Sequence, residues 1–154
     1  MNQANEINQL LQRLQFETPN CGGAYYFWKI DLAYSGDLAE SVKRYLLRLE
    51  EPEHAPDLVL EKVADFKRHL REKLHYWSNH RTSLDCREEV TELYPSLEAE
   101  FQEKIHAFLE QENTLGVYVI NSEILYSFGE DHVNDDTLIQ TSDAFYVLHF
   151  GWSS

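Results

Sequence analysis

Two nine-residue segments rich in aromatic side chains constrain the fold of this chain most strongly. Residues 24–32 read AYYFWKIDL and residues 144–152 read AFYVLHFGW. Successive side chains of a β-strand point to opposite faces, and both segments place large apolar side chains on both faces. A strand that is apolar on both sides has to be covered on both sides. We therefore expect these segments to form strands of a sheet that helices pack against.

The first of these strands has one face that is apolar throughout. Tyr26, Trp28, Ile30 and Leu32 share that face, while the opposite face also carries charged side chains. The alternation predicts that Trp28 is buried.

Two further strands are predicted near the C-terminal end. Residues 115–121 and 124–128 are apolar runs, and the two residues between them give the spacing of a hairpin. With the first two segments they predict a mostly antiparallel sheet of about four strands.

Helical periodicity dominates the remainder of the chain. Apolar side chains recur every three or four residues in four segments, and Asp37 with Glu40 three positions later resembles a capping box. The segments are 3–16, 38–50, 57–80 and 96–112. The pattern predicts an α+β fold, and a length of 154 residues fits one domain spanning residues 1–154.

Charge is distributed unevenly along the chain. The formal net charge is −14, yet residues 41–90 are neutral overall. After Lys104 the sequence has no Lys or Arg. A field of one sign repels nucleic acid and anionic membranes and attracts cationic partners.

The acidic surplus is densest over Gly129–Asp143, which we interpret as a loop between two apolar strands. Fixed carboxylates next to large aromatic side chains suit a protein interface. We expect the following residues to bind a basic protein partner: Glu130, Asp131, Asp135, Asp136, Asp143, Tyr126 and Trp152. Ca²⁺ binding, a carboxylate pair for glycoside hydrolysis and a solvated loop are the alternatives for this segment.

Motifs for catalysis or for metal binding are absent from the sequence. There is no HExxH motif, no clustered Cys/His spacing and no glycine-rich phosphate loop. We therefore predict no catalytic residues, no metal and no cofactor. A pocket in which His75, His80 or His149 meets a carboxylate would instead favour an enzyme whose site is assembled from dispersed residues.

The two cysteines, Cys21 and Cys86, are too few for a disulfide framework and form no CxxC pair. They agree with a reducing compartment, and we expect the chain to fold without a disulfide. No apolar run approaches the length of a membrane span, and the polar start lacks the features of a secretion signal. These features predict a cytoplasmic protein that binds no membrane.

The overall profile resembles the immunity proteins of bacterial toxin systems, which are small, acidic and poor in motifs. The resemblance covers composition and rests on no motif. It implies an acidic inhibitor, a monomer or weak dimer, that blocks the cleft of a basic toxin such as a nuclease without contacting nucleic acid itself. The alternatives are a nucleic-acid mimic that occupies a DNA-binding protein and a small enzyme.

Overall fold

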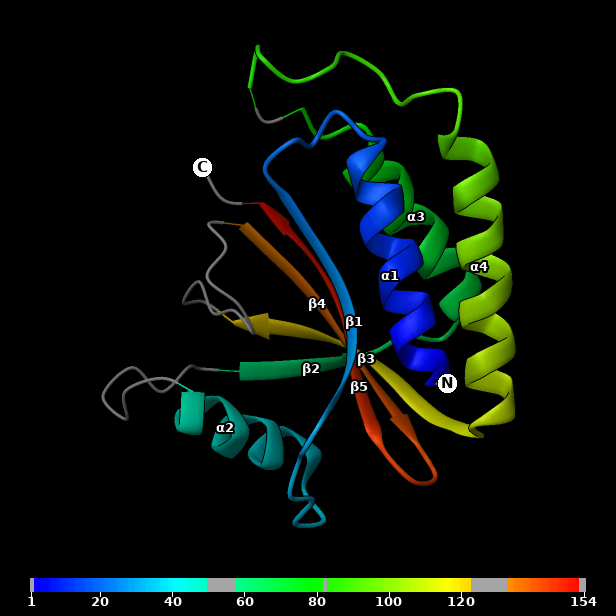
Figure 1. Ribbon diagram of the computed structural model, residues 1–154. Coiled ribbons are helices and arrows are strands. Elements are labelled where there is room, and N and C mark those ends of the chain that lie inside the picture. Colours follow the sequence, from blue (N-terminus) through cyan, green and yellow to red (C-terminus); the bar gives the residue numbers. More distant parts are fainter. Residues whose placement is uncertain (1, 50–57, 82, 123–132, 153–154) are drawn as a thin grey trace.

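A single antiparallel sheet organises the chain (Figure 1). The computed structural model describes residues 2–49, 58–81, 83–122 and 133–152. Five strands within these ranges pair in the order β1-β5-β4-β3-β2, every neighbouring pair antiparallel. They are β1 (Gly23–Ile30), β2 (Leu58–Lys62), β3 (Thr114–Ser122), β4 (Val133–Thr141) and β5 (Phe145–Trp152). The predicted α+β class is confirmed, with five strands rather than about four.

Helices from the described ranges lie on both faces of the sheet (Figure 1). One face carries α1, α3 and α4, and the other carries α2. Their bounds are α1 (Gln3–Phe16), α2 (Leu38–Leu49), α3 (Phe66–Ser78) and α4 (Tyr94–Gln111). Coverage on both sides is what the two aromatic strands require.

The larger core lies between the sheet and the three-helix layer. Tyr25, Phe27 and Phe150 from the edge pair of strands meet Leu74 of α3 and Phe101 of α4 there. Phe27 stacks on Tyr146, with ring centroids 5.4 Å apart and an interplanar angle of 13°. This face of β1 is therefore the more deeply buried one, although it also carries the exposed Lys29.

The smaller core lies under α2 on the opposite face. Val42 and Leu46 of α2 pack there against Ile30, Leu138 and Val147. Trp28 borders this cluster and is half-buried, and Tyr26 on the same face is 43% exposed. The predicted burial of Trp28 is thus only partly correct, because residues 38–49 cover just part of this face.

Three of the predicted helices are confirmed with small changes at their ends. In α1 the predicted stripe Ile7, Leu10, Leu11 and Leu14 is buried. The Asp37 carboxylate accepts a hydrogen bond from the Glu40 backbone N–H at 3.1 Å, as the capping pattern predicted. Helix α4 begins two residues before the predicted position, with Pro95 in its first turn, where the missing N–H costs nothing.

The predicted helix over 57–80 is wrong in its first half. Residues Leu58–Lys62 form β2, an edge strand paired with β3, and only Phe66–Ser78 is helical. Asp65 starts the helix, since its carboxylate accepts from the Arg68 N–H at 3.1 Å. Leu60 and Val63 fit a helical stripe by spacing, but pairing with β3 decides their conformation.

The acidic segment is not a single loop. Its second half forms β4, which lies between β3 and β5 in the sheet. Two acids in a central strand contradict strand propensity, and both are paired there with basic side chains of other elements. The predicted strand over 124–128 lies outside the described residues.

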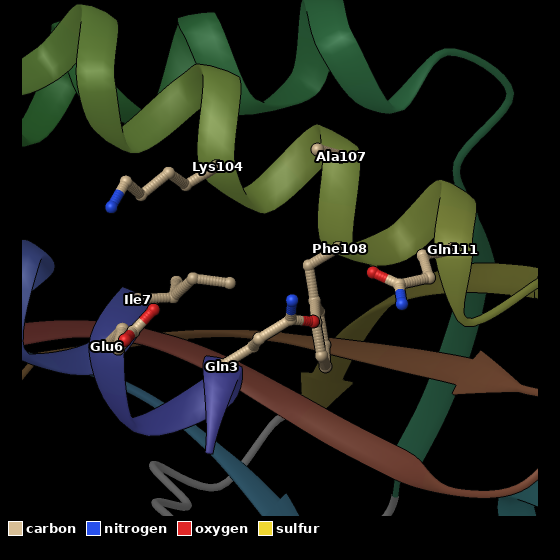
Figure 2. A pocket seen from close by; sticks show the side chains of 7 residues that line it. All are labelled: Gln3, Glu6, Ile7, Lys104, Ala107, Phe108 and Gln111. Carbon is tan, nitrogen blue, oxygen red and sulfur yellow. The ribbon is translucent and has the colours of Figure 1, made fainter. Parts of the chain in front are cut away.

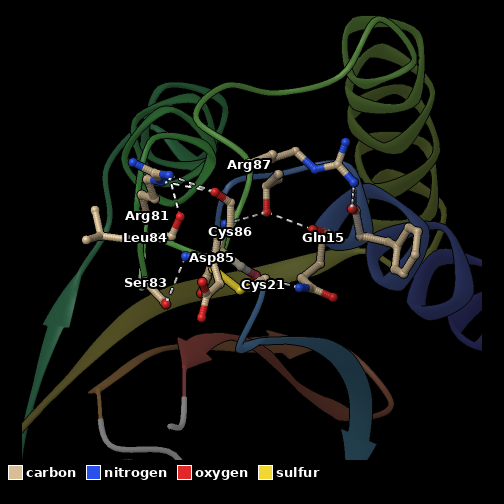
Figure 3. The surroundings of a disulfide bond; sticks show 11 residues. Gln15, Cys21, Arg81, Ser83, Leu84, Asp85, Cys86 and Arg87 are labelled. Atoms are coloured by element: carbon tan, nitrogen blue, oxygen red, sulfur yellow. Dashed lines mark hydrogen bonds between the residues drawn. A yellow bond between two sulfur atoms is a disulfide. The ribbon is translucent and has the colours of Figure 1, made fainter.

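A disulfide joins Cys21 to Cys86, so the expectation of a chain without disulfides is wrong. The bridge links the α1–β1 turn to the connection between α3 and α4 (Figure 3), and the two Cα atoms are 5.5 Å apart. The cysteines are 65 residues apart, and only the packing of α1 against α4 and β1 brings them together. In the part of the chain that the structure describes, no helix is long and apolar enough to cross a bilayer.

We expect the core tyrosines to make stability fall in alkaline solution. Burial raises the pKa of Tyr25 and Tyr146 to about 12 and also raises the pKa of Tyr94. An unfolded tyrosine loses its proton near pH 10. Because the unfolded state releases protons first, this contribution is fully present below about pH 10 and is lost as the pH rises towards about 12.

Urea unfolding at several values from about pH 8 to about pH 12, with tyrosinate absorbance as a second readout, measures this effect. Tyr146→Phe should make the loss of stability with pH less steep. Titration of all tyrosines near pH 10 in the folded protein would contradict the expectation.

Candidate functional site

The seven predicted partner-binding residues do not form one cluster. Tyr126, Glu130 and Asp131 lie outside the described residues. Asp135 and Asp136 lie in β4, Asp143 in the β4–β5 turn and Trp152 at the end of β5. Consecutive strand residues point to opposite faces, so Asp135 and Asp136 face different helical layers.

Asp136 is buried on the face that carries α2. Its side chain is 5% exposed, and a hydrogen bond of 2.5 Å joins its Oδ1 to His149 Nδ1. The two residues are direct partners across β4 and β5, and Tyr26 is the partner of His149 across β1. The Tyr26 and His149 rings stack with centroids 6.2 Å apart. A histidine thus meets a carboxylate, from residues that are distant in the sequence.

Asp135 attaches α3 to the sheet on the opposite face. Its Oδ2 lies 2.8 Å from Lys73 Nζ and accepts from Trp77 Nε1 at 3.0 Å. The Asp135 side chain is 16% exposed. A hollow of about 420 Å³ opens beside this contact, with Tyr76 and Asn121 in its lining. Asp135 therefore has a structural role that the sequence did not predict.

Trp152 is half-buried and packs at the margin of the larger core. Its ring lies 6.2 Å from that of His80. His80 also packs against Trp77, and His75 lies beside Asn79, so neither of these two histidines approaches a carboxylate in the interactions described here. Within the described ranges, no group of three His, Cys, Asp or Glu side chains is arranged to hold a metal ion.

Asp143 is the predicted residue that is plainly at the surface. It lies in the turn between β4 and β5, and the adjacent Ser142 N–H donates to the Asn113 carbonyl at 3.1 Å. The Ser142 hydroxyl donates to the Glu112 carbonyl at 3.3 Å. These contacts hold the hairpin turn against the C-terminal end of α4, as the lower part of Figure 1 shows.

Four carboxylates from three segments gather at this end of the molecule. We define the acidic end as Asp31, Glu110, Glu112 and Asp143. Asp31 follows β1 and lines the same hollow as Asp143, and Glu110 and Glu112 end α4. The Tyr146 hydroxyl donates to Glu112 Oε1 at 3.1 Å, and the raised pKa of Tyr146, caused by burial and by Glu112, keeps that proton in place. Glu112 is thereby held in a defined position.

Residues of the acidic end line two surface hollows. One of about 480 Å³ is lined by Asp31, Asp143 and Phe145, with Lys29 as the cation in its lining. Another of about 330 Å³ is lined by Glu110, Phe66 and Val117 among others. Carboxylates thus line both hollows together with apolar side chains.

Exposed apolar side chains lie at the same end. Tyr34 is 52% exposed and packs its ring 5.8 Å from that of Phe145. Leu115, at the start of β3 after the end of α4, is 56% exposed. Apolar anchors within a charged rim are the composition of a protein interface.

A third hollow, of about 210 Å³, separates the first turns of α1 from the last turns of α4 (Figure 2). Gln3 and Gln111 extend their amides towards it above the Phe108 ring, whereas the Lys104 ammonium points away. Lys104 is the last cation of the sequence.

Asp31, Glu110 and Glu112 were not among the residues predicted from the sequence to bind a partner. Glu110 and Glu112 lie at the end of a predicted helix. They also belong to the region after Lys104 that has no Lys or Arg, which was the available sequence signal. Their position beside Asp143 depends on the packing of α4 against the sheet. Comparison of the chain with protein-family models, with curated proteins and with solved structures finds no match.

Proposed function

We propose that this chain is an acidic inhibitor, like an immunity protein, that neutralises a basic toxin by docking on its active-site cleft. The observation that carries the proposal is the acidic end, where carboxylates from three segments, most of them exposed, line two hollows together with apolar side chains. A net charge of −14 adds long-range attraction to a cationic cleft. A nuclease domain is one kind of toxin with a cationic cleft that could bind the acidic end.

The proposal places the interface differently from the acidic loop of the sequence prediction. Asp135 and Asp136 are engaged within the fold, so we assign them structural roles and retain Asp143. Asp31, Glu110 and Glu112 join Asp143 in the proposed interface. Binding by Glu130, Asp131 and Tyr126 stays a prediction, as does binding by Trp152.

Charge reversal at the acidic end should slow association with the partner. The variant Glu110→Lys/Asp143→Lys changes two exposed side chains, so its free energy of unfolding should stay within about 0.5 kcal/mol of the parent. Complementary fields raise association rates by about 10–10³-fold, so we expect at least a tenfold slower association at low salt and a weaker dependence on salt. Stopped-flow kinetics with a partner purified after affinity capture measure both.

A matched control separates site from net charge. The variant Glu88→Lys/Glu89→Lys makes the same change in net charge in the exposed connection between α3 and α4. It should slow association much less. Equal effects of the two variants would show that the acidic end is not the interface.

The second candidate function is a small enzyme, because His149 and Asp136 form the histidine–carboxylate pair that a dispersed catalytic site uses. In such a site, Asp136 would orient His149 as a general base. His149→Gln would then abolish activity in a panel of hydrolase substrates while leaving capture of a basic partner intact. If His149→Gln keeps both the enzymatic activity and the capture of a basic partner, this second candidate function is excluded.

The cellular compartment of the protein is also part of the proposal. A cytoplasmic location stays a prediction from the sequence, and the disulfide counts against it, because structural disulfides persist mainly in oxidising compartments. Alkylation of the chain at the moment of cell lysis, followed by mass spectrometry, would show whether Cys21 and Cys86 are bridged in the cell.

A further inference from the structure

We propose that the Cys21–Cys86 disulfide is a site of thiol–disulfide exchange, at which a thiol reductant attacks Cys21. Reduction then releases the connection between α3 and α4 from the α1–β1 turn. The ligand class is a small thiol of the glutathione type or a dithiol oxidoreductase. The inference is independent of the proposed inhibitor function.

The two cysteines differ in exposure. Cys21 is exposed in the α1–β1 turn, whereas Cys86 is 5% exposed. Exchange requires an attacking thiolate to reach a sulfur of the bridge. Access therefore directs the attack to Cys21 and makes Cys86 the leaving group.

The exchange is a balanced two-step reaction. A reductant thiolate forms a bond to Cys21 Sγ, the bond between the two cysteines breaks, and Cys86 leaves as a thiolate that then takes a proton. A second thiolate attacks the reductant's sulfur in the mixed disulfide and releases Cys21. Two reductant thiols are oxidised to one disulfide, and Cys21 and Cys86 are reduced to two thiols.

The bridge holds the middle of the connection. Among residues 83–89, Cys86 alone is buried, and its neighbours on both sides are exposed. Arg87 Nη2 donates to the Phe16 carbonyl at 3.4 Å, which is long for a hydrogen bond. The covalent link attaches this stretch to the turn that follows α1 (Figure 3).

Contacts on either side of the bridge do not depend on it. Thr91 anchors the far end of the connection, because its hydroxyl donates to Glu17 Oε2 at 2.6 Å and its N–H donates to the Glu17 carbonyl at 3.0 Å. The α1–β1 turn is held by the Gln15 amide, which donates to the Asn20 carbonyl at 2.7 Å, and by the buried Asn20 amide. Reduction should therefore release a local segment while the core stays folded.

Arg81 gives the released segment its own structure. Its guanidinium donates to the Cys86 carbonyl from Nε at 3.1 Å and from Nη2 at 2.9 Å, and to the Leu84 carbonyl at 2.9 Å (Figure 3). These bonds close the turn within the connection.

The first experiment maps the site of attack. The oxidised protein is mixed with reduced glutathione, quenched at short times with an alkylating reagent, digested and analysed by mass spectrometry. We expect the glutathione adduct on Cys21 and the alkyl group on Cys86. An adduct that forms first on Cys86 would overturn the proposal.

The second experiment measures the release of the connection. Arg81 and Arg87 are trypsin sites within this connection, and Lys104 in α4 is a matched site outside it. On reduction, cleavage at Arg81 and Arg87 should rise by about tenfold or more, and cleavage at Lys104 should not change, because proteolysis follows the population of the open form. The variant Cys21→Ser/Cys86→Ser should behave like the reduced protein.

Two outcomes would overturn the proposal that the disulfide holds this connection locally. Equal acceleration at Lys104 would show that the bridge stabilises the whole fold, and unchanged cleavage at Arg81 and Arg87 would show that it does not hold the connection. Circular dichroism of the double-serine variant distinguishes these outcomes from simple failure to fold.

Discussion

Replacing Asp136 with alanine should lower the free energy of unfolding by about 3–5 kcal/mol, the range for removing one partner of a buried pair. His149 is 1% exposed, and its Nδ1 is hydrogen-bonded to the Asp136 side chain at 2.5 Å. Without the carboxylate, the imidazole stays buried and loses that acceptor. Because the two residues are partners across β4 and β5, the loss also weakens the specification of strand register. Urea denaturation followed by circular dichroism measures the change.

A double-mutant cycle tests whether the pair acts as a unit. Asp136→Leu and His149→Leu should each cost a similar amount alone, and Asp136→Leu/His149→Leu should cost clearly less than their sum, since replacing both partners by apolar side chains is often nearly neutral. Asp143→Ala is the control for removing an exposed carboxylate and should change stability by no more than about 0.5 kcal/mol. Additive effects of the two leucines would show that the pair is not coupled.

Replacing Trp77 with alanine should cost about 3–5 kcal/mol, as for other buried large aromatic side chains. Trp77 is 1% exposed, and its ring lies parallel to that of Phe150, with centroids 6.3 Å apart and an interplanar angle of 12°. Its indole N–H also donates to Asp135, so the substitution removes a hydrogen bond from a carboxylate that is largely buried. The cavity and the lost donor act in the same direction.

Two further variants separate these contributions. Trp77→Phe keeps an aromatic ring but lacks the N–H, so it should cost about 1.5–3 kcal/mol, the range for a hydrogen bond to a charged group. Tyr76→Ala changes the adjacent residue of α3, which is 54% exposed, and should have a much smaller effect. A loss below about 1 kcal/mol for Trp77→Ala would mean that α3 does not pack on β4 and β5 as described.

These two predictions concern groups that the sequence analysis interpreted differently. Asp135 and Asp136 were assigned to an acidic loop between two apolar strands. The structure accommodates them because Lys73 and Trp77 of α3 meet Asp135, and His149 of β5 meets Asp136. No local pattern in the segment 133–141 records those partners.

The sequence by itself determined the features that depend on local periodicity. The aromatic strands at 24–32 and 144–152, the apolar stripes of α1 and α4 and the cap at Asp37 follow from the spacing of side chains along one element. The same periodicity favoured a helix over 57–80, because five residues of an edge strand are too few to reveal a period of two.

Tertiary structure alone decided which elements meet. In the structure, β2 pairs with β3, and β4 lies between β3 and β5. Cys21 and Cys86, which are 65 residues apart in the sequence, form a disulfide. Tertiary structure also placed Asp143 beside the end of α4, which creates the acidic end. Strand pairing, disulfide pairing and surface charge clusters depend on contacts between segments distant in the chain, and the energy of such contacts is not encoded in the pattern of either segment alone.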